Sequence, residues 1–305
     1  MIYTITLNPS LDYIVHISQL QQGETNRSSN EEIYPGGKGF NVALMLHKLG
    51  LESTAIGFVA GFTGHEIERL LKEKEVKAEL YRLDSGNSRI NVKIKAESET
   101  EINGTGATIT EEKLDLLMEK VSLMEKDDVL VLAGSIPPSL DEGVYHKIIT
   151  LAKQKAVMVV VDATGALLKN TLADHPFLIK PNLAELEMLC DCKIKSLDDL
   201  LACVTMLQQL GALNVLVSLG KEGAILVDSS SQAYYCQAGR GQLKNSVGSG
   251  DSMVAGFIAG YMKTQNLQEA LRLGSACGSA TAFSEDIGDI EQVEAIYQQL
   301  AVRLL

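Results

Sequence analysis

The sequence has no long apolar segment and no excess of positive charge, and each absence excludes a class of protein. No run approaches the ~20 consecutive apolar residues that a bilayer crossing requires, so no membrane role is indicated. The formal net charge is −12 at pH 7. This charge argues against binding along a nucleic-acid backbone, which needs a basic stripe. An anionic ligand would instead have to be met by a few local cations.

A secretory leader and a cysteine framework are also missing. The chain begins MIYTITLNPS, without a basic leader or a small-residue cleavage site, so we expect no secretory signal. Five cysteines are an odd number, and Cys190 and Cys192 lack the spacing of a zinc site or a redox pair. We therefore expect a cytoplasmic protein with reduced thiols.

Two common nucleotide-binding motifs are absent. A dinucleotide-binding fold places G-x-G-x-x-G directly after its first strand, whereas the first predicted strand here, residues 2–7, runs into NPSLD. A Walker A loop ends in Gly-Lys followed by Ser or Thr, but Lys38 is followed by glycine and Lys221 by glutamate. The dehydrogenase hypothesis loses its main support, and a nucleotide would have to bind in another way.

Strand-like and helix-like segments alternate along most of the chain. Runs rich in β-branched residues, typical of strands buried on both faces, occupy residues 2–7, 54–59, 128–134, 157–162, 177–180, 214–219 and 223–228. Helical patterns lie between them, at residues 41–50, 65–73, 111–124, 144–154 and 197–211. The alternation predicts a mostly parallel sheet covered by helices.

Two segments depart from this pattern. Residues of about 12–34 and 80–104 alternate polar and apolar side chains, which fits strands with one wet face. We expect them to form a small lid sheet inserted into a single domain, residues 1–305. Lid strands of this kind have exposed edges, and pairing between two subunits would cover them. We therefore expect a homodimer.

Two glycine-rich stretches precede helical patterns. Residues 245–253 read NSVGSGDSM; alone, such a stretch is more often a tight turn than a ligand site. Asp251 could be a charge that stabilises the helix N-terminus or a catalytic base. Residues 35–41, PGGKGFN, could likewise be a flexible turn or a place where the backbone approaches a ligand at a helix N-terminus.

Five motifs in this order, TLNPSLD, GGKGFNVA, KPNLAELE, VSLGKEGA and NSVGSGDSMVAGF, resemble the PfkB group of the ribokinase-like sugar kinases over residues 1–290. The segments SRINVKIK and ETEING are similar to the fructose-phosphate branch of that family. The resemblance implies a ribokinase-like three-layer α/β/α fold with a mostly parallel sheet and a small β-sheet lid. It also implies ATP and Mg²⁺ as cofactors and phosphorylation of fructose 1-phosphate at C6. Tagatose 6-phosphate phosphorylated at C1, and a catalytically silent sugar-phosphate sensor, remain alternatives.

The resemblance assigns roles around the reacting phosphate. Asp251 would be the general base, and the backbone N–H groups of Gly248, Ser249 and Gly250 would receive the charge on the transferring γ-phosphoryl group. Glu185 would act on Mg²⁺ through water, or could simply cap its helix. The residues implied for nucleotide binding are Lys180, Asn182, Glu185, Ser218, Gly220, Gly223, Ser275, Gly278 and Ser279.

The sugar phosphate would lie near the early motif and the lid. The resemblance places Asp12, Gly37, Lys38 and Asn41 on the sugar. Arg89 is the strongest candidate for its phosphate, because a planar guanidinium binds phosphate oxygens in a bidentate manner. The remaining candidates are Arg27 and Lys38 for the phosphate, and Asn91 and Ser135 for other polar contacts.

Overall fold

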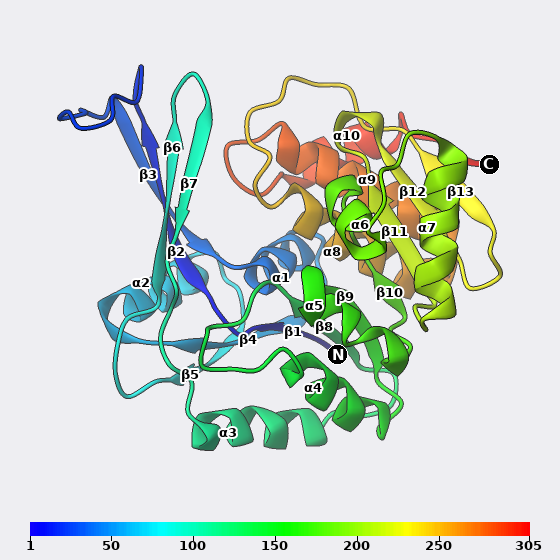
Figure 1. Cartoon of the computed structure of the whole chain (residues 1–305), viewed down its shortest axis with the longest axis horizontal. Helices are drawn as coiled ribbons and strands as arrows, with labels where there is room; N and C mark the ends of the chain where they lie inside the picture. The colour runs from blue at the N-terminus through cyan, green and yellow to red at the C-terminus, as the bar shows by residue number, and fades with distance from the viewer.

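A ten-stranded sheet runs through the main body of the computed structural model, which describes residues 1–305 (Figure 1). Its strand order is β14-β13-β12-β11-β10-β9-β8-β1-β4-β5. Neighbouring strands from β11 to β5 pair in parallel, and β12, β13 and β14 extend the sheet with antiparallel pairs. The strands are β1 (Ile2–Thr6), β4 (Ser53–Val59), β5 (Ala78–Arg82), β8 (Val129–Ala133), β9 (Met158–Asp162), β10 (Leu178–Ile179), β11 (Asn214–Ser218), β12 (Ala224–Val227), β13 (Ala233–Cys236) and β14 (Val302–Leu304).

Helices cover both faces of this sheet. One face carries α1 (Lys38–Lys48), α2 (Gly61–Glu73), α8 (Ser249–Thr264), α9 (Leu267–Ala282) and α10 (Ile290–Tyr297). The other carries α3 (Glu111–Ser122), α4 (Val144–Lys153), α5 (Gly165–Lys169), α6 (Leu183–Cys190) and α7 (Leu197–Gln209). The arrangement confirms the predicted three layers, with helices on both faces of a mostly parallel sheet. None of the helices has both the length and the hydropathy that crossing a membrane demands.

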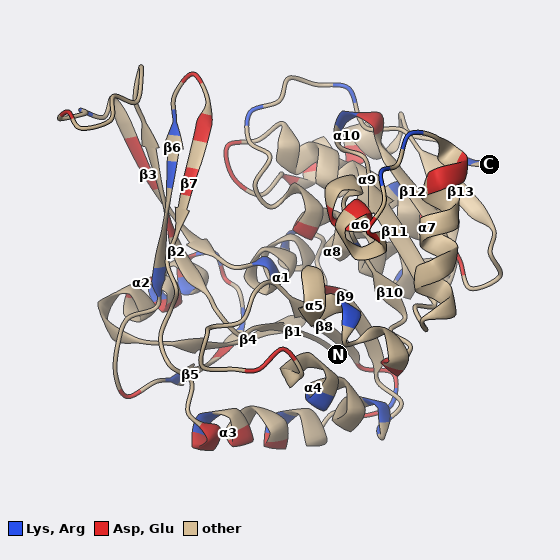
Figure 2. Ribbon diagram, in the orientation of Figure 1, with Lys and Arg blue, Asp and Glu red and all other residues tan.

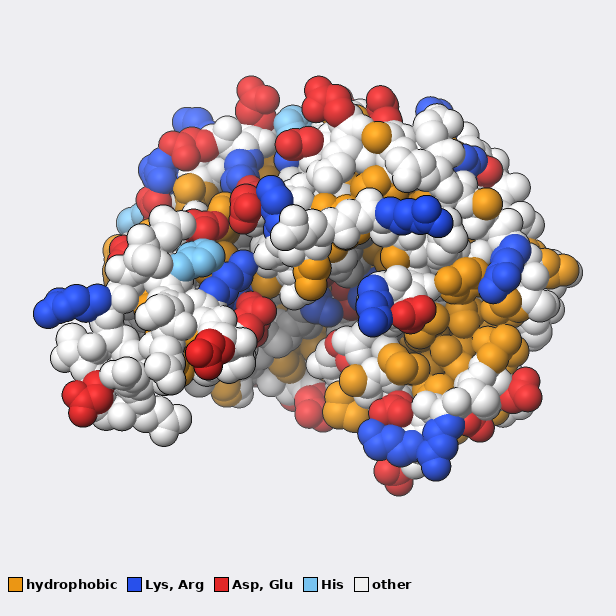
Figure 3. All heavy atoms as spheres, turned by 90° about the horizontal axis from the view of Figure 1, so that it is seen from above, with side chains coloured by type: hydrophobic (Ala, Val, Ile, Leu, Met, Phe, Trp, Pro, Cys, Tyr) orange, Lys and Arg blue, Asp and Glu red, His pale blue; other side chains and the backbone are white.

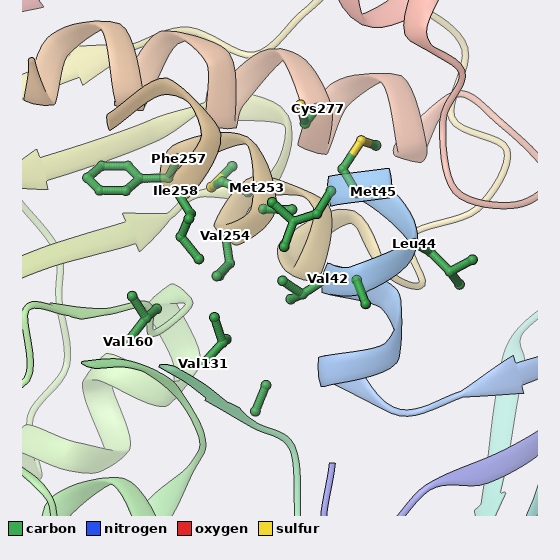
Figure 4. Close-up of a cluster of buried hydrophobic side chains, with 14 of the residues drawn as sticks. Val42, Leu44, Met45, Val131, Val160, Met253, Val254, Phe257, Ile258 and Cys277 are labelled. Atoms are coloured by element: carbon green, nitrogen blue, oxygen red, sulfur yellow. The ribbon is translucent and has the colours of Figure 1, made fainter. Parts of the chain in front are cut away.

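The central strands show why the sheet needs cover on both sides. All five residues of β8 are buried, and they alternate between two hydrophobic clusters. Val131 packs in the cluster under α1 and α8, whereas Leu130 and Leu132 pack in the cluster under α3 and α4. Figure 4 shows Val131 and Val160 below the apolar side chains of α8. A strand with both faces apolar can only be stable between two helical layers.

Small residues fix α8 against α9. A Cβ atom added at Gly256 would lie 2.7 Å from Cys277 Sγ and from the Leu273 carbonyl oxygen, so only glycine lets the two helices approach this closely. The Ser249 hydroxyl at the start of α8 donates to the carbonyl of Gly278 in α9 at 2.8 Å. This packing holds the N-terminus of α8 in place at the edge of the sheet.

A separate four-stranded sheet, the lid, stands off the main body (Figure 1). Its order is β3-β2-β6-β7, formed by β2 (Ser10–His16), β3 (Asn30–Gly36), β6 (Arg89–Lys95) and β7 (Glu99–Asn103). One difference from the sequence prediction concerns residues 78–82, which pair with β4 as the edge of the main sheet. The second lid segment therefore begins at Arg89, later than the predicted residue 80. The short antiparallel strands β13 and β14 were not predicted.

Candidate active site

A cavity of about 860 Å³ lies between the lid and the main body. Its walls are the inner face of the lid, the start of α1, the start of α8 and the segments that follow β10 and β11. Figure 3 shows the molecule hollowed between these two parts. Figure 2 shows Lys and Arg positions along β6 and Asp and Glu positions along β7 of the lid. Ligands of open parallel sheets lie beyond the carboxyl ends of the strands, and this cavity has that position.

Asp251 is a buried carboxylate of this cavity. It lies in the first turn of α8, is 6% exposed, and accepts a hydrogen bond from Asn41 Nδ2 at 2.7 Å. Burial raises the pKa of Asp251 to about 6, with the Asp162 charge acting in the same direction and the Lys38 charge opposing it. A carboxylate with a pKa near 6 is a better proton acceptor at neutral pH than an ordinary aspartate.

The first turn of α8 presents free backbone donors beside this carboxylate. Gly248 is the N-cap with φ 76°, a left-handed conformation that favours glycine. Of the amides expected to bind the phosphoryl group, that of Ser249 donates to the Ser246 carbonyl oxygen at 3.4 Å, whereas the N–H groups of Gly250 and of Asp251 donate to no protein acceptor. Lys180 Nζ lies close by, since a Cβ added at Gly250 would be 3.1 Å from it. Free amides, a helix N-terminus and an ammonium group are together suited to bind an anion.

Asp162 joins two lysines directly below the cavity. Its Oδ1 accepts from Lys38 Nζ at 2.9 Å and lies 3.5 Å from Lys180 Nζ, and the Asp162 side chain is fully buried. Burial works to raise the pKa of Asp162, but the charges of Lys180 and Lys38 hold that pKa below its ordinary value. The carboxylate therefore stays ionised and positions both ammonium groups.

Asp12 lies at the lid side of the cavity. Ser10 Oγ at 2.6 Å and Asn91 Nδ2 at 3.1 Å both donate to Asp12 Oδ1. Lys93 Nζ donates to Asp12 Oδ2 at 2.8 Å. Asp12 is 8% exposed and Lys93 is 5% exposed. A carboxylate in this position is suited to accept sugar hydroxyl groups.

Arg89 lines the cavity at the base of the lid. Its Nε donates to the Asn8 carbonyl oxygen at 2.9 Å, which fixes the direction of the side chain. Burial lowers the pKa of Arg89, and the nearby Asp12 charge opposes that change. The two terminal nitrogens have no protein hydrogen-bond partner and are free to bind an anion.

Asn182 and Glu185 cap helix α6 reciprocally. The Glu185 N–H donates to Asn182 Oδ1 at 2.8 Å, and the Asn182 N–H donates to Glu185 Oε2 at 2.8 Å. This is a capping box, so the ordinary structural role of both residues is present. The other oxygen of Glu185 has no protein partner, and the residue lines the cavity. Capping and a ligand role are therefore compatible.

Comparison with known proteins explains this combination of groups. Residues 5–292 match the family model of the pfkB family carbohydrate kinases. The chain belongs to the pfkB family of carbohydrate kinases. It is 44% identical to a 1-phosphofructokinase of Bacillus subtilis (strain 168) over the full length of both chains. It is 33% identical to a D-tagatose-1-phosphate kinase of Bacillus licheniformis, covering 99% of each chain.

Solved structures agree with this assignment. The crystal structure of phosphofructokinase-2 from Escherichia coli in complex with substrates and products superimposes with a TM-score of 0.92 at 30% identity, covering 98% of each chain. The resemblance seen in the sequence motifs is thereby confirmed at the level of family and fold. As a pfkB kinase, the chain is an ATP-dependent enzyme that phosphorylates a sugar.

The cavity of this pfkB kinase brings together most of the residues singled out from the sequence. The predicted residues that line it are Asp12, Gly37, Lys38, Asn41, Arg89, Asn91, Lys180, Asn182, Glu185, Ser218, Gly220, Gly223, Gly248, Ser249, Gly250, Asp251, Ser275, Gly278 and Ser279. Arg27 and Ser135 do not line it. Arg27 lies in the exposed loop between β2 and β3, and Ser135 is exposed after β8.

Sequence reasoning placed Ser10 and Asp162 among the polar residues at strand ends but gave them no role, and it missed Lys93; all three make close polar contacts in the site. A signal for Lys93 was present, because Arg89, Asn91 and Lys93 alternate along one strand and so share a face. Asp162 ends a predicted strand, the position where polar groups gather in this class of fold. Nothing in the sequence indicated that two distant lysines would meet it.

Proposed function

We propose that the protein transfers the γ-phosphoryl group of ATP to the C6 hydroxyl of fructose 1-phosphate, producing fructose 1,6-bisphosphate. The observation that carries this proposal is the first turn of α8, where the carboxylate of Asp251 lies beside the unpaired amides of Gly250 and Asp251. The 44% identity with a 1-phosphofructokinase over the whole chain supports the choice of sugar.

The chemistry follows from these groups. Asp251 accepts the proton of the C6 hydroxyl while that oxygen forms a bond to the γ-phosphorus and the bond to the β-phosphate oxygen breaks. The amides at the start of α8 stabilise the charge on the transferring group. Asp162 holds Lys38 and Lys180 so that their ammonium groups face the phosphates. Asp12 and Arg89 orient the sugar phosphate from the lid.

D-tagatose 1-phosphate is the second candidate substrate, because one relative with that activity in its name is 33% identical over nearly the whole chain. It differs from fructose 1-phosphate only in the configuration at C4. ATP turnover with fructose 1-phosphate, tagatose 1-phosphate, tagatose 6-phosphate and fructose 6-phosphate decides between them. We expect the highest kcat/KM with fructose 1-phosphate. Absence of turnover with all four would favour the silent sensor.

Mg²⁺ fits the charges of this cavity without a dedicated protein cage. No group of three or more His, Cys, Asp or Glu side chains is arranged to hold a metal ion. Mg²⁺ in phosphoryl-transfer sites is commonly held by substrate phosphates and water with one or two carboxylates, and the free oxygen of Glu185 can supply such a contact. When bound, the ion would neutralise phosphate charge. We therefore propose that Glu185 acts on Mg²⁺ through water.

The change Glu185→Gln tests this role separately from capping. Glutamine keeps an oxygen that accepts from the Asn182 N–H, so the melting temperature should stay within about 3 °C of the wild type, as expected for a change well below 1 kcal/mol. The loss of charge should raise the Mg²⁺ concentration that gives half-maximal rate by about tenfold. A Mg²⁺ dependence equal to that of the wild type would exclude Glu185 from the metal site.

We further propose that two subunits associate through their lids. The outer face of the lid is largely apolar, with Glu31 and Thr100 toward its tip, and three of its isoleucines are exposed: Ile33 by 47%, Ile90 by 40% and Ile102 by 59%. They lie on adjacent strands together with Tyr13 and Val92, on the face opposite Asp12. A contiguous apolar surface on a sheet typically marks a protein contact, and a second copy of the lid is self-complementary to it.

The change Ile102→Lys should weaken this association. A charge placed in the contact would have to be desolvated, so sedimentation velocity should show the mass shifting from dimer to monomer at micromolar concentration. Leu123, 71% exposed at the end of α3 and far from the lid, supplies the control Leu123→Lys, which should leave the mass unchanged. A wild-type protein that sediments as a monomer would overturn the proposal.

A further inference from the structure

Protein donors occupy most of the hydrogen-bond acceptor positions of the Asp12 carboxylate. Its Oδ1 accepts from Ser10 and Asn91, and its Oδ2 accepts from Lys93 at 2.8 Å. A carboxylate offers about four acceptor positions, so about one remains open to a ligand. A sugar that donates two hydroxyl hydrogen bonds to Asp12 therefore needs Lys93 to move away.

Lys93 is itself short of partners. Its side chain is only 6% exposed, and Asp12 is its single hydrogen-bond partner although an ammonium group has three donors. Glu101, its cross-strand neighbour on β7, makes no ion pair with it. Lys93 and Glu101 both line the cavity. A buried ammonium group with a single acceptor is stabilised when an anion supplies further hydrogen-bond acceptors.

The other cations of the cavity are not paired with Asp12. Lys38 and Lys180 are tied to Asp162. Arg89 Nε donates to the carbonyl of Asn8 while its terminal nitrogens stay free, and Lys221 makes no ion pair. Lys93 therefore differs from these cations. Its partner is Asp12, the carboxylate that we expect to bind sugar hydroxyl groups. Movement of this one side chain would change both the phosphate site and the hydroxyl site.

We propose that Lys93 makes the pocket selective for phosphorylated sugars. It binds the phosphate group that the substrate already carries, and on leaving Asp12 it frees Oδ2 for a sugar hydroxyl. An unphosphorylated sugar offers Lys93 no anion, so the lysine stays on Asp12 and the hydroxyl site remains partly filled. This inference rests on the proposed function, because it takes a sugar phosphate as the substrate.

The test compares the affinities of fructose 1-phosphate and unphosphorylated fructose by calorimetry, together with kcat/KM for fructose 1-phosphate. In Lys93→Met the affinity for fructose 1-phosphate should fall about 10- to 100-fold, the size expected for losing a hydrogen bond to a charged group. The affinity for fructose should stay equal or rise, so the ratio of the two affinities collapses. Lys93→Arg, which keeps the charge, should restore most of the ratio.

Lys95 supplies the matched control, since it lies two residues further along the same face of β6 and does not line the cavity. Lys95→Met should leave the ratio unchanged. If Lys93→Met weakens both sugars by the same factor, the lysine only supports Asp12 and the inference is wrong. Lys93→Gln, whose amide can still donate to Asp12, carries the same test if the methionine variant does not fold.

Failure of the proposed function has a different signature. A wild-type protein that does not turn over fructose 1-phosphate refutes the proposed reaction. A wild-type protein that does turn it over, with an unchanged affinity ratio in the Lys93 variants, refutes the role of Lys93 alone.

Discussion

Replacing Asp251 with asparagine should lower kcat by about 10²- to 10⁴-fold, the range that general base catalysis contributes, while ATP affinity changes little. Asparagine keeps an oxygen for the hydrogen bond from Asn41 but cannot accept the hydroxyl proton. In the wild type, kcat/KM should fall as the pH drops below about 6, because Asp251 is then protonated. Steady-state kinetics from pH 5 to 9 measure both effects, and near-normal kcat in Asp251→Asn would remove this residue from the base role.

The same variant should be more stable than the wild type at pH 8. Burial raises the pKa of Asp251 from 3.8 to about 6, so folding disfavours the charged form, and this cost grows as the pH rises through that interval. Removing the charge should increase the free energy of unfolding by on the order of 3 kcal/mol at pH 8. The difference between variant and wild type should vanish below about pH 4, and urea unfolding at both pH values tests this sign.

Asp162→Asn should lower both the free energy of unfolding and kcat. The variant leaves Lys180, whose side chain is 4% exposed, without its carboxylate partner. Removing one partner of a buried ion pair lowers the free energy of unfolding by about 3 to 5 kcal/mol. We also expect kcat to fall at least about tenfold, because both ammonium groups lose their orientation and a misplaced group costs orders of magnitude. Denaturant unfolding and steady-state kinetics measure the two losses.

The pH profile distinguishes this electrostatic role from simple unfolding. The charge of Asp162 helps to raise the pKa of Asp251, so its removal should move the acid limb of kcat/KM to lower pH. Asp174→Asn is the control, because Asp174 is a buried acid paired with His146 away from the cavity. That variant should lose stability without a shift of the profile. An unshifted profile in Asp162→Asn would contradict the proposed coupling.

The fold was predictable from the sequence because its strands are long apolar runs with helical patterns between them. Strands β13 and β14 have four and three residues, too few for a periodic pattern, and their pairing depends on β12 already being in place. Residues 78–82 carry the same mixed polar pattern as the lid. They pair with β4, a contact made after the intervening helix α2 has turned the chain back.

The candidate site was predictable where a motif is local and unpredictable where contacts are distant. The loop and first turn around Asp251 are contiguous, and most motif residues line the cavity. Asp162 and Lys38 are 124 positions apart in the sequence, so neither their residue types nor their spacing predicts the contact. For Asn182 and Glu185, sequence left capping and ligand binding open; the capping box is formed, and metal binding remains a proposal.

The packing of α8 against α9 has a mechanical consequence. The proposed proton acceptor, Asp251, and the proposed phosphate-binding amides belong to one helical turn, which is anchored by close glycine contacts and by the hydrogen bond from Ser249 to Gly278. The distance between them is therefore built into a single rigid body and does not depend on the position of the lid. In the proposed reaction the lid brings the sugar to this fixed turn, so a substitution where the lid joins the main body should change KM and the rate of ATP hydrolysis by water before it changes the geometry of transfer.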